Sequence, residues 1–222
     1  MTRALRNTGL SLAMFGLFAL SIVGQSIVGE REYNEDQRSH GRPTVGYFAY
    51  LRTGHFVESV FENWESEFLQ MSAYVLLTAF LFQKGSAESK DPDSPEPVDA
   101  DPREHRDDPK APWPVRQGGW VLRLYENSLT IVLFLLFVLS FLLHAAGGAR
   151  EYSSEQQEHG EQAVSLLEYL GTSRFWFESF QNWQSEFLSV GAIVVLSIFL
   201  RQRGSPESKP VAAPHDETGE GR

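Results

Sequence analysis

The strongest constraint on the fold of this chain is a block of sequence that occurs twice. Residues 56–69 read FVESVFENWESEFL, and residues 175–188 read FWFESFQNWQSEFL. Asn182 follows Asn63 by 119 positions, and the same offset aligns residues 31–33 (REY) with 150–152 and residues 88–90 (ESK) with 207–209. So many identities in one ungapped register indicate a tandem duplication, and each half is therefore expected to be one structural unit repeated.

Each repeat contains two apolar stretches long enough to cross a membrane. Residues 9–29 carry no charge over 21 positions, and a helix of that length spans roughly 30 Å. The repeat counterpart, residues 128–148, lies in the middle of the chain, where it cannot be a cleaved signal peptide. The other two predicted spans, 64–83 and 183–201, begin at Trp64 and Trp183, which are expected to anchor them at the membrane interface. The sequence thus predicts an all-α fold, an integral membrane four-helix bundle made of two tandem repeats, with short helices outside the membrane.

The predicted domain boundaries follow the duplication. Repeat 1 covers residues 1–90 and repeat 2 covers residues 118–209. Residues 91–117, between them, are rich in proline, aspartate and glutamate, a composition too polar to offset the entropy of an ordered chain. We expect a disordered acidic linker there and a disordered tail over residues 210–222.

The distribution of positive charge predicts the orientation. Of the 19 lysines and arginines, 13 lie in the termini and around the linker, and 6 lie in the loops that join the paired spans. This bias places both termini and the linker in the cytoplasm of a multi-pass protein of the inner (plasma) membrane. The formal net charge of −10 argues against binding to nucleic acid, and the absence of cysteine excludes disulfides and thiol chemistry. The expected partners are the lipid bilayer and either a protein partner or a second copy of the chain.

Polar side chains near the outer ends of the predicted spans form a candidate pocket. Because a carboxylate near hydrocarbon is costly, we expect the glutamates of the duplicated block to face the interior of the bundle. The candidate pocket residues are Glu67, Glu186, Asn63, Asn182, Gln25 and His144. No metal site or cofactor is otherwise predicted, and the secondary candidates for metal ligands are His40, His159, Glu32 and Glu151.

The same glutamates also have a purely structural interpretation. Glu67 and Glu186 each follow an interfacial tryptophan by three positions, so they fit equally well in the lipid headgroup layer, as part of a packing and anchoring device. No catalytic motif such as Gly-x-Ser-x-Gly, a P-loop or His-Glu-x-x-His occurs, so an enzyme is not expected. The leading hypothesis is a non-enzymatic scaffold or partner subunit in the bacterial envelope. The alternative is a small transport or ion-handling protein with an outward-facing polar pocket at Glu67 and Glu186.

The duplicated blocks also carry a family resemblance. Arg-Glu-Tyr after the first span of each repeat and Asn-Trp-x-Ser-Glu-Phe before the second are similar to the pattern of an uncharacterised family of small bacterial integral membrane proteins with four helices. The resemblance covers nearly the whole chain apart from the linker and the tail. It implies a location in the bacterial inner membrane, and it implies no activity, ligand or catalytic residue.

Overall fold

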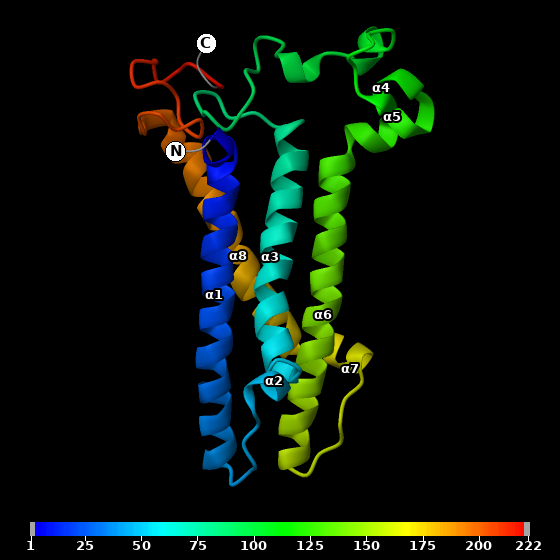
Figure 1. Ribbon diagram of the computed structural model, residues 1–222, viewed down its shortest axis with the longest axis vertical. Helices are drawn as coiled ribbons and strands as arrows, with labels where there is room; N and C mark the ends of the chain where they lie inside the picture. Colours follow the sequence, from blue (N-terminus) through cyan, green and yellow to red (C-terminus); the bar gives the residue numbers. More distant parts are fainter. Residues whose placement is uncertain (1–2, 220–222) are drawn as a thin grey trace. The chain divides into compact units, whose positions relative to one another are not determined.

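The computed structural model describes residues 3–219, and every regular element among them is a helix (Figure 1). The absence of any strand in this part of the chain confirms the predicted all-α fold. The long helices are α1 (Arg3–Ser39), α3 (Gly54–Thr78), α6 (Ser128–Glu158) and α8 (Ser173–Phe199). The short elements are α2 (Tyr47–Tyr50), η1 (Pro97–Asp99), η2 (Pro102–His105), α4 (Trp113–Gln117), α5 (Gly119–Glu126) and α7 (Leu166–Leu170).

Three helices in residues 3–219 are long and apolar enough to cross a membrane. They correspond to α1, α6 and α8; α1 and α6 contain the predicted spans 9–29 and 128–148, and α8 covers the span 183–201 up to its end at Phe199. The remaining predicted span, 64–83, begins in α3, which is not among the three and ends at Thr78, so residues 79–83 lie beyond the helix. The reason is chemical: α3 carries Glu62, Glu65 and Glu67, so the uncharged run between the last of these and the end of the helix at Thr78 is short.

The chain divides into two compact units that do not coincide with the predicted repeats. One comprises Met1–Phe61 and Leu142–Phe175, and the other comprises Glu62–Phe141 and Trp176–Arg222. Each unit therefore combines corresponding segments of both repeats.

In the first unit, α2 and α7 each carry a buried tyrosine that packs against a glycine of the long helix before it. Tyr50 of α2 contacts Gly29 of α1, and Tyr169 of α7 contacts Gly148 of α6. In both pairs a side chain on the glycine would overlap the phenol ring. Glycine at these two positions, 119 residues apart, therefore lets each short helix pack closely on its long helix.

The loops that lead into the short helices are also held in matching ways. The side chain of Asn34 donates to the carbonyl of Val45 at 2.9 Å and accepts from its N–H at 2.8 Å. At the equivalent positions, the Ser153 hydroxyl makes the same two bonds to Val164, at 3.1 and 3.0 Å. Two different side chains thus bond to the same pair of backbone groups in the two repeats. Such bonds matter because a buried backbone N–H or carbonyl without a partner costs free energy.

Threonine caps begin both α3 and α8. Thr53 Oγ1 accepts from the backbone N–H of Phe56 at 3.2 Å, and Thr172 Oγ1 accepts from that of Phe175 at 3.3 Å. Such a bond satisfies one of the N–H groups that the first turn of a helix leaves without a partner. Threonine is among the residue types that helix N-caps prefer.

In the second unit, a duplicated loop follows α3 and α8. Ser89 Oγ accepts from the N–H of Gln83 at 2.8 Å, and Ser208 Oγ accepts from that of Gln202 at 2.9 Å. These bonds close the loops QKGSAESK (83–90) and QRGSPESK (202–209) in the same way. The segment that the sequence predicts as a linker contains η1, η2 and α4, and its Asp99 pairs with Lys90, just before the segment, at 2.5 Å. Its disorder in solution remains a prediction.

Candidate functional site

A buried cluster of a carboxylate, an imidazole and a phenol lies in the first unit. The Tyr169 hydroxyl donates a hydrogen bond to Glu58 Oε1 at 3.1 Å. A carboxylate oxygen of Glu58 and a ring nitrogen of His144 lie within 4.8 Å of each other. His144 and Tyr169 are completely buried, and Glu58 is 7% exposed. The chain thus encloses two ionisable groups, Glu58 and His144, where water cannot solvate them freely.

Small residues bring α3 and α6 together at this point. A Cβ added to Gly147 would lie 2.5 Å from the backbone nitrogen of Glu58 and 3.1 Å from the carbonyl oxygen of Gly54. The two backbones therefore touch, and His144 lies one turn before this contact on α6. The ring of Phe175 covers the imidazole, with the two ring centroids 4.9 Å apart. The cluster is consequently held by backbone packing as well as by its own polar bonds.

A second polar cluster in the same unit surrounds His55. The imidazole Nε2 lies 3.3 Å from Glu32 Oε2, and Nδ1 lies 3.2 Å from the Tyr50 hydroxyl. The Glu151 carboxylate accepts from the backbone N–H of His55. Burial raises the pKa of Tyr50 to about 12, with Glu32 adding to the shift. Burial also raises the pKa of Glu151, while the nearby His55 opposes the rise.

In the second unit, α3 continues the acidic face that begins at Glu58. Glu62 accepts a hydrogen bond from the side chain of Asn182, and Glu65 accepts one from the Trp183 indole N–H at 2.9 Å. Glu65 is completely buried. Glu58, Glu62 and Glu65 are spaced by four and three positions, so they share one side of the helix.

The structure distributes the predicted pocket residues over several places. Gln25 contacts Ser59, with 3.4 Å between Gln25 Nε2 and Ser59 Oγ. Glu186 is half-buried and interacts electrostatically with Glu67, which is exposed, as is Asn63. Asn182 binds Glu62 as described, and His144 lies beside Glu58.

The secondary metal-ligand candidates also separate. Glu32 and Glu151 both approach His55, a histidine that sequence reasoning did not select. His40 Nδ1 lies 3.3 Å from Asp36, its neighbour on α1, and both His40 and His159 are exposed. Both histidines thus differ from His144, which is completely buried.

Sequence reasoning missed Glu58, Tyr169 and His55. A signal for Glu58 was present, because residues 58, 62 and 65 have the same helical spacing as 63, 67 and 70. Periodicity alone does not say which of these two faces is buried. Tyr169 was detectable as one member of a duplicated tyrosine pair with Tyr50.

The helical fold, the three apolar helices and the buried polar clusters define a helical protein suited to a membrane environment. The chain belongs to the family described as "Domain of unknown function (DUF6766)", which matches residues 1–220. The expected membership of an uncharacterised family is thereby confirmed. No curated protein and no solved structure matches the chain.

Proposed function

We propose that this protein is a non-enzymatic, multi-pass membrane protein that binds a cation at the buried site formed by Glu58 and His144. The observation that carries the proposal is the burial of both groups within 4.8 Å of each other. Taking a carboxylate and an imidazole out of water costs free energy, and such groups in membrane helices commonly mark ion or ligand sites. This is the ion-handling hypothesis, with its site moved from Glu67 and Glu186 to Glu58.

The proposed setting is a bundle of four crossing helices in the bacterial inner membrane, with both termini in the cytoplasm. Three apolar helices support it, and so does the bias of lysine and arginine toward the termini and the linker. In this setting α3 is the fourth crossing helix, and its carboxylates face protein rather than lipid. Glu58 and His144 then lie near the outer end of the bundle, because the polar loops that follow α1 and α6 face outward.

Binding without conduction fits the composition of the helices. Residues 129–143 of α6 contain no ionisable side chain, and neither do residues 9–29 of α1. A cation path through the bilayer requires polar groups along its length. We therefore propose a site that is reached from one side only.

Cation-dependent stabilisation of the detergent-solubilised protein tests this function. A ligand that binds only the folded state stabilises it by RT ln(1 + L/Kd), where L is the ligand concentration, so the unfolding midpoint rises with the logarithm of that concentration once it exceeds the dissociation constant. Across a panel of Mg²⁺, Ca²⁺, Mn²⁺, Co²⁺ and Zn²⁺, at least one ion should stabilise the wild type, and Glu58→Gln should abolish the response. Glu67→Gln combined with Glu186→Gln is the matched control and should respond as the wild type does. An equal response of Glu58→Gln and wild type would refute the site, and loss only in the control would move it to Glu67 and Glu186.

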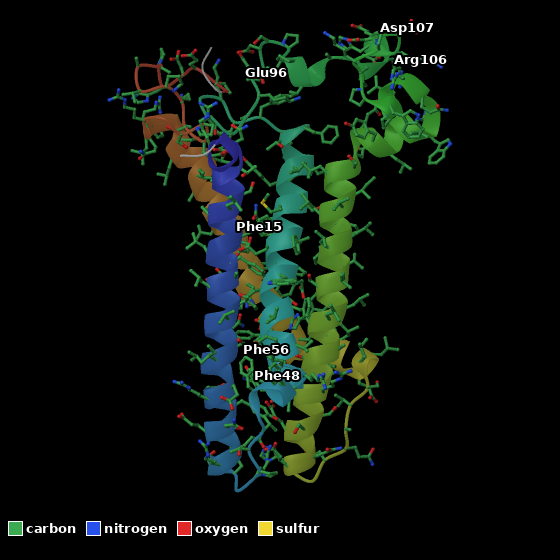
Figure 2. All side chains as sticks on the ribbon, viewed as in Figure 1. Phe15, Phe48, Phe56, Glu96, Arg106 and Asp107 are labelled. Carbon is green, nitrogen blue, oxygen red and sulfur yellow. The ribbon has the colours of Figure 1, made fainter. Side chains whose placement is uncertain are left out.

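A scaffold or partner subunit is the second candidate, and one observation favours it. Phe48 on α2 and Leu167 on α7 occupy equivalent positions of the two repeats, and each side chain is 79% exposed (Figure 2 labels Phe48). Each short helix thus buries its tyrosine and presents an apolar residue outward. Replacing both with serine should release a co-purifying protein partner if these residues form the contact, whereas unchanged co-purification would count against this candidate.

A further inference from the structure

We infer that the Glu58 and His144 pair binds a borderline divalent transition metal, such as Zn²⁺ or Co²⁺, with Tyr169 as a positioning residue. The inference rests on the proposed function and specifies its ligand class. It begins from the donor types. A carboxylate alone favours Mg²⁺ or Ca²⁺, but an imidazole suits zinc, cobalt, nickel and iron. The chain has no cysteine, so thiolate-preferring ions have no ligand here.

The distance between the donors is compatible with a shared ion. Metal–ligand bonds to imidazole and carboxylate are roughly 2.1 Å, which sets neighbouring donor atoms roughly 3 to 3.5 Å apart. The Glu58 oxygen and the His144 nitrogen lie within 4.8 Å. Small rotations of the two side chains would therefore bring both atoms into coordination distance, with no movement of the helix backbones.

The surroundings orient both ligands. Tyr169 donates to Glu58 Oε1 at 3.1 Å, which fixes the carboxylate, as groups behind metal ligands commonly do. Phe175 packs over the His144 ring and limits its rotation. The backbone contact between Gly147 and Glu58 holds α3 against α6. A pre-arranged, buried pair loses little entropy when an ion binds.

The duplication does not repeat this pair of residues. The position equivalent to His144 in repeat 1 is Gln25, and the position equivalent to Glu58 in repeat 2 is Phe177. Gln25 instead contacts Ser59. The arrangement therefore predicts one metal ion for each chain and not two.

Metal stoichiometry and cobalt spectroscopy on the full-length protein test the inference. After removal of metal with a chelator, the wild type should bind about one Zn²⁺ per chain, measured by elemental analysis after gel filtration. Bound Co²⁺ should show visible absorption bands typical of coordination by nitrogen and oxygen ligands. Glu58→Gln and His144→Gln should each weaken binding at least about 100-fold. Tyr169→Phe should weaken it about 10-fold while the Co²⁺ spectrum persists at saturation, since the ligands themselves remain.

Two controls keep the result interpretable. The double variant His40→Gln, His159→Gln removes exposed histidines and should bind as the wild type does. Glu35→Gln removes an exposed carboxylate of α1 and should also bind as the wild type does. Each variant is first checked for an unchanged gel-filtration profile, and His144→Asn replaces any His144→Gln protein that fails to fold.

The outcomes separate the two proposals. Zn²⁺ binding that survives both Glu58→Gln and His144→Gln, or that disappears only with His40 and His159, would overturn the metal assignment. Stabilisation by Ca²⁺ or Mg²⁺ without any Zn²⁺ or Co²⁺ binding would overturn it as well, while leaving the cation-binding function intact. If no cation of the panel binds, both proposals fail.

Discussion

The backbone of α6 at Gly147 touches the backbone of α3 at Glu58, and a Cβ on the glycine would lie only 2.5 Å from the Glu58 nitrogen. The contact sets the separation of the two helices where the buried carboxylate and imidazole lie. Because the clash would be with backbone, no side-chain rotation can relieve it. The identity of one small residue therefore controls the spacing of the candidate site.

Gly147→Ala should consequently destabilise the protein by about 1–3 kcal/mol, the usual range for overpacking a tight contact. Unfolding in detergent, followed by circular dichroism, measures the change. Gly16→Ala is the matched control, because no atom lies within 4 Å of the added Cβ there. Equal stability of Gly147→Ala and Gly16→Ala would show that the helices do not touch at this position.

Asn34→Ala should loosen the loop before α2. The substitution leaves the N–H and the carbonyl of Val45 without their side-chain partner, at an expected cost of about 1–3 kcal/mol. Hydrogen exchange at the Val45 amide measures the loss directly. Asn34→Ser should retain more protection than Asn34→Ala, because Ser153 makes the same pair of bonds to Val164. Identical exchange in the two variants would contradict the proposed role of the side chain.

Stability should depend on pH through Glu151. Burial raises the pKa of this carboxyl above its ordinary value of 4.5, so the folded state favours the protonated form. The stabilisation is complete below the unfolded pKa and is lost as pH rises through the folded pKa. Glu151→Gln should therefore gain stability relative to wild type as pH rises above 4.5 and through the raised pKa of the folded state, measured as unfolding midpoints over a pH series. Glu35→Gln, at an exposed position of α1, should show a constant difference, and a constant difference for Glu151→Gln would contradict the assignment.

Single cysteines report the orientation cleanly, because the chain contains none of its own. A cysteine replacing Ser39, at the end of α1, should react with a membrane-impermeant thiol reagent in intact cells. A cysteine replacing Ser94, in the acidic linker, should react only after the membrane is permeabilised. Both serines are exposed, so accessibility within the protein does not limit either reaction. The opposite labelling pattern would reverse the proposed topology.

Deleting residues 91–108 should leave a folded, membrane-inserted protein. The paired interactions within this segment join near neighbours, as Lys90 does with Asp99 and Asp101 does with Arg103. Removing the segment therefore breaks few bonds to the helices. Membrane extraction and gel filtration compare the variant with wild type, and loss of the inserted protein would mean that the linker has a structural role.

The long helices were predictable from the sequence, but the face of α3 that is buried was not. Uncharged runs and the repeat offset were enough to find α1, α6 and α8, because these signals lie within each helix. The burial of Glu58 depends instead on Gly54 and Gly147 meeting across a long sequence separation. A helical spacing of four and three suits residues 58, 62 and 65 as well as residues 63, 67 and 70, and only the packing partner decides between them.

Some polar contacts were likewise predictable from the sequence, and others were not. The threonine caps of α3 and α8 follow from residue type and position, so the sequence was sufficient for them. The carboxylates Glu32 and Glu151 were selected as candidates, but their approach to His55 joins α1, α6 and the first turn of α3. Local sequence patterns do not predict a contact among three segments that are distant in the chain. The contact between Tyr169 and Glu58 was unpredictable for the same reason, because the two residues are far apart in the chain.

The candidate site takes its carboxylate from one copy of the duplicated hairpin and its imidazole from the other. Glu58 has Phe177 as its counterpart, and His144 has Gln25. A dimer of the first hairpin alone would therefore have Glu58 carboxylates but glutamine at the position of His144, and a dimer of the second would have His144 imidazoles but phenylalanine at the position of Glu58. The two copies thus contribute different ligands to one site. Because both copies lie in one chain, each molecule contains one of each, whereas separate hairpins could also pair with their own kind.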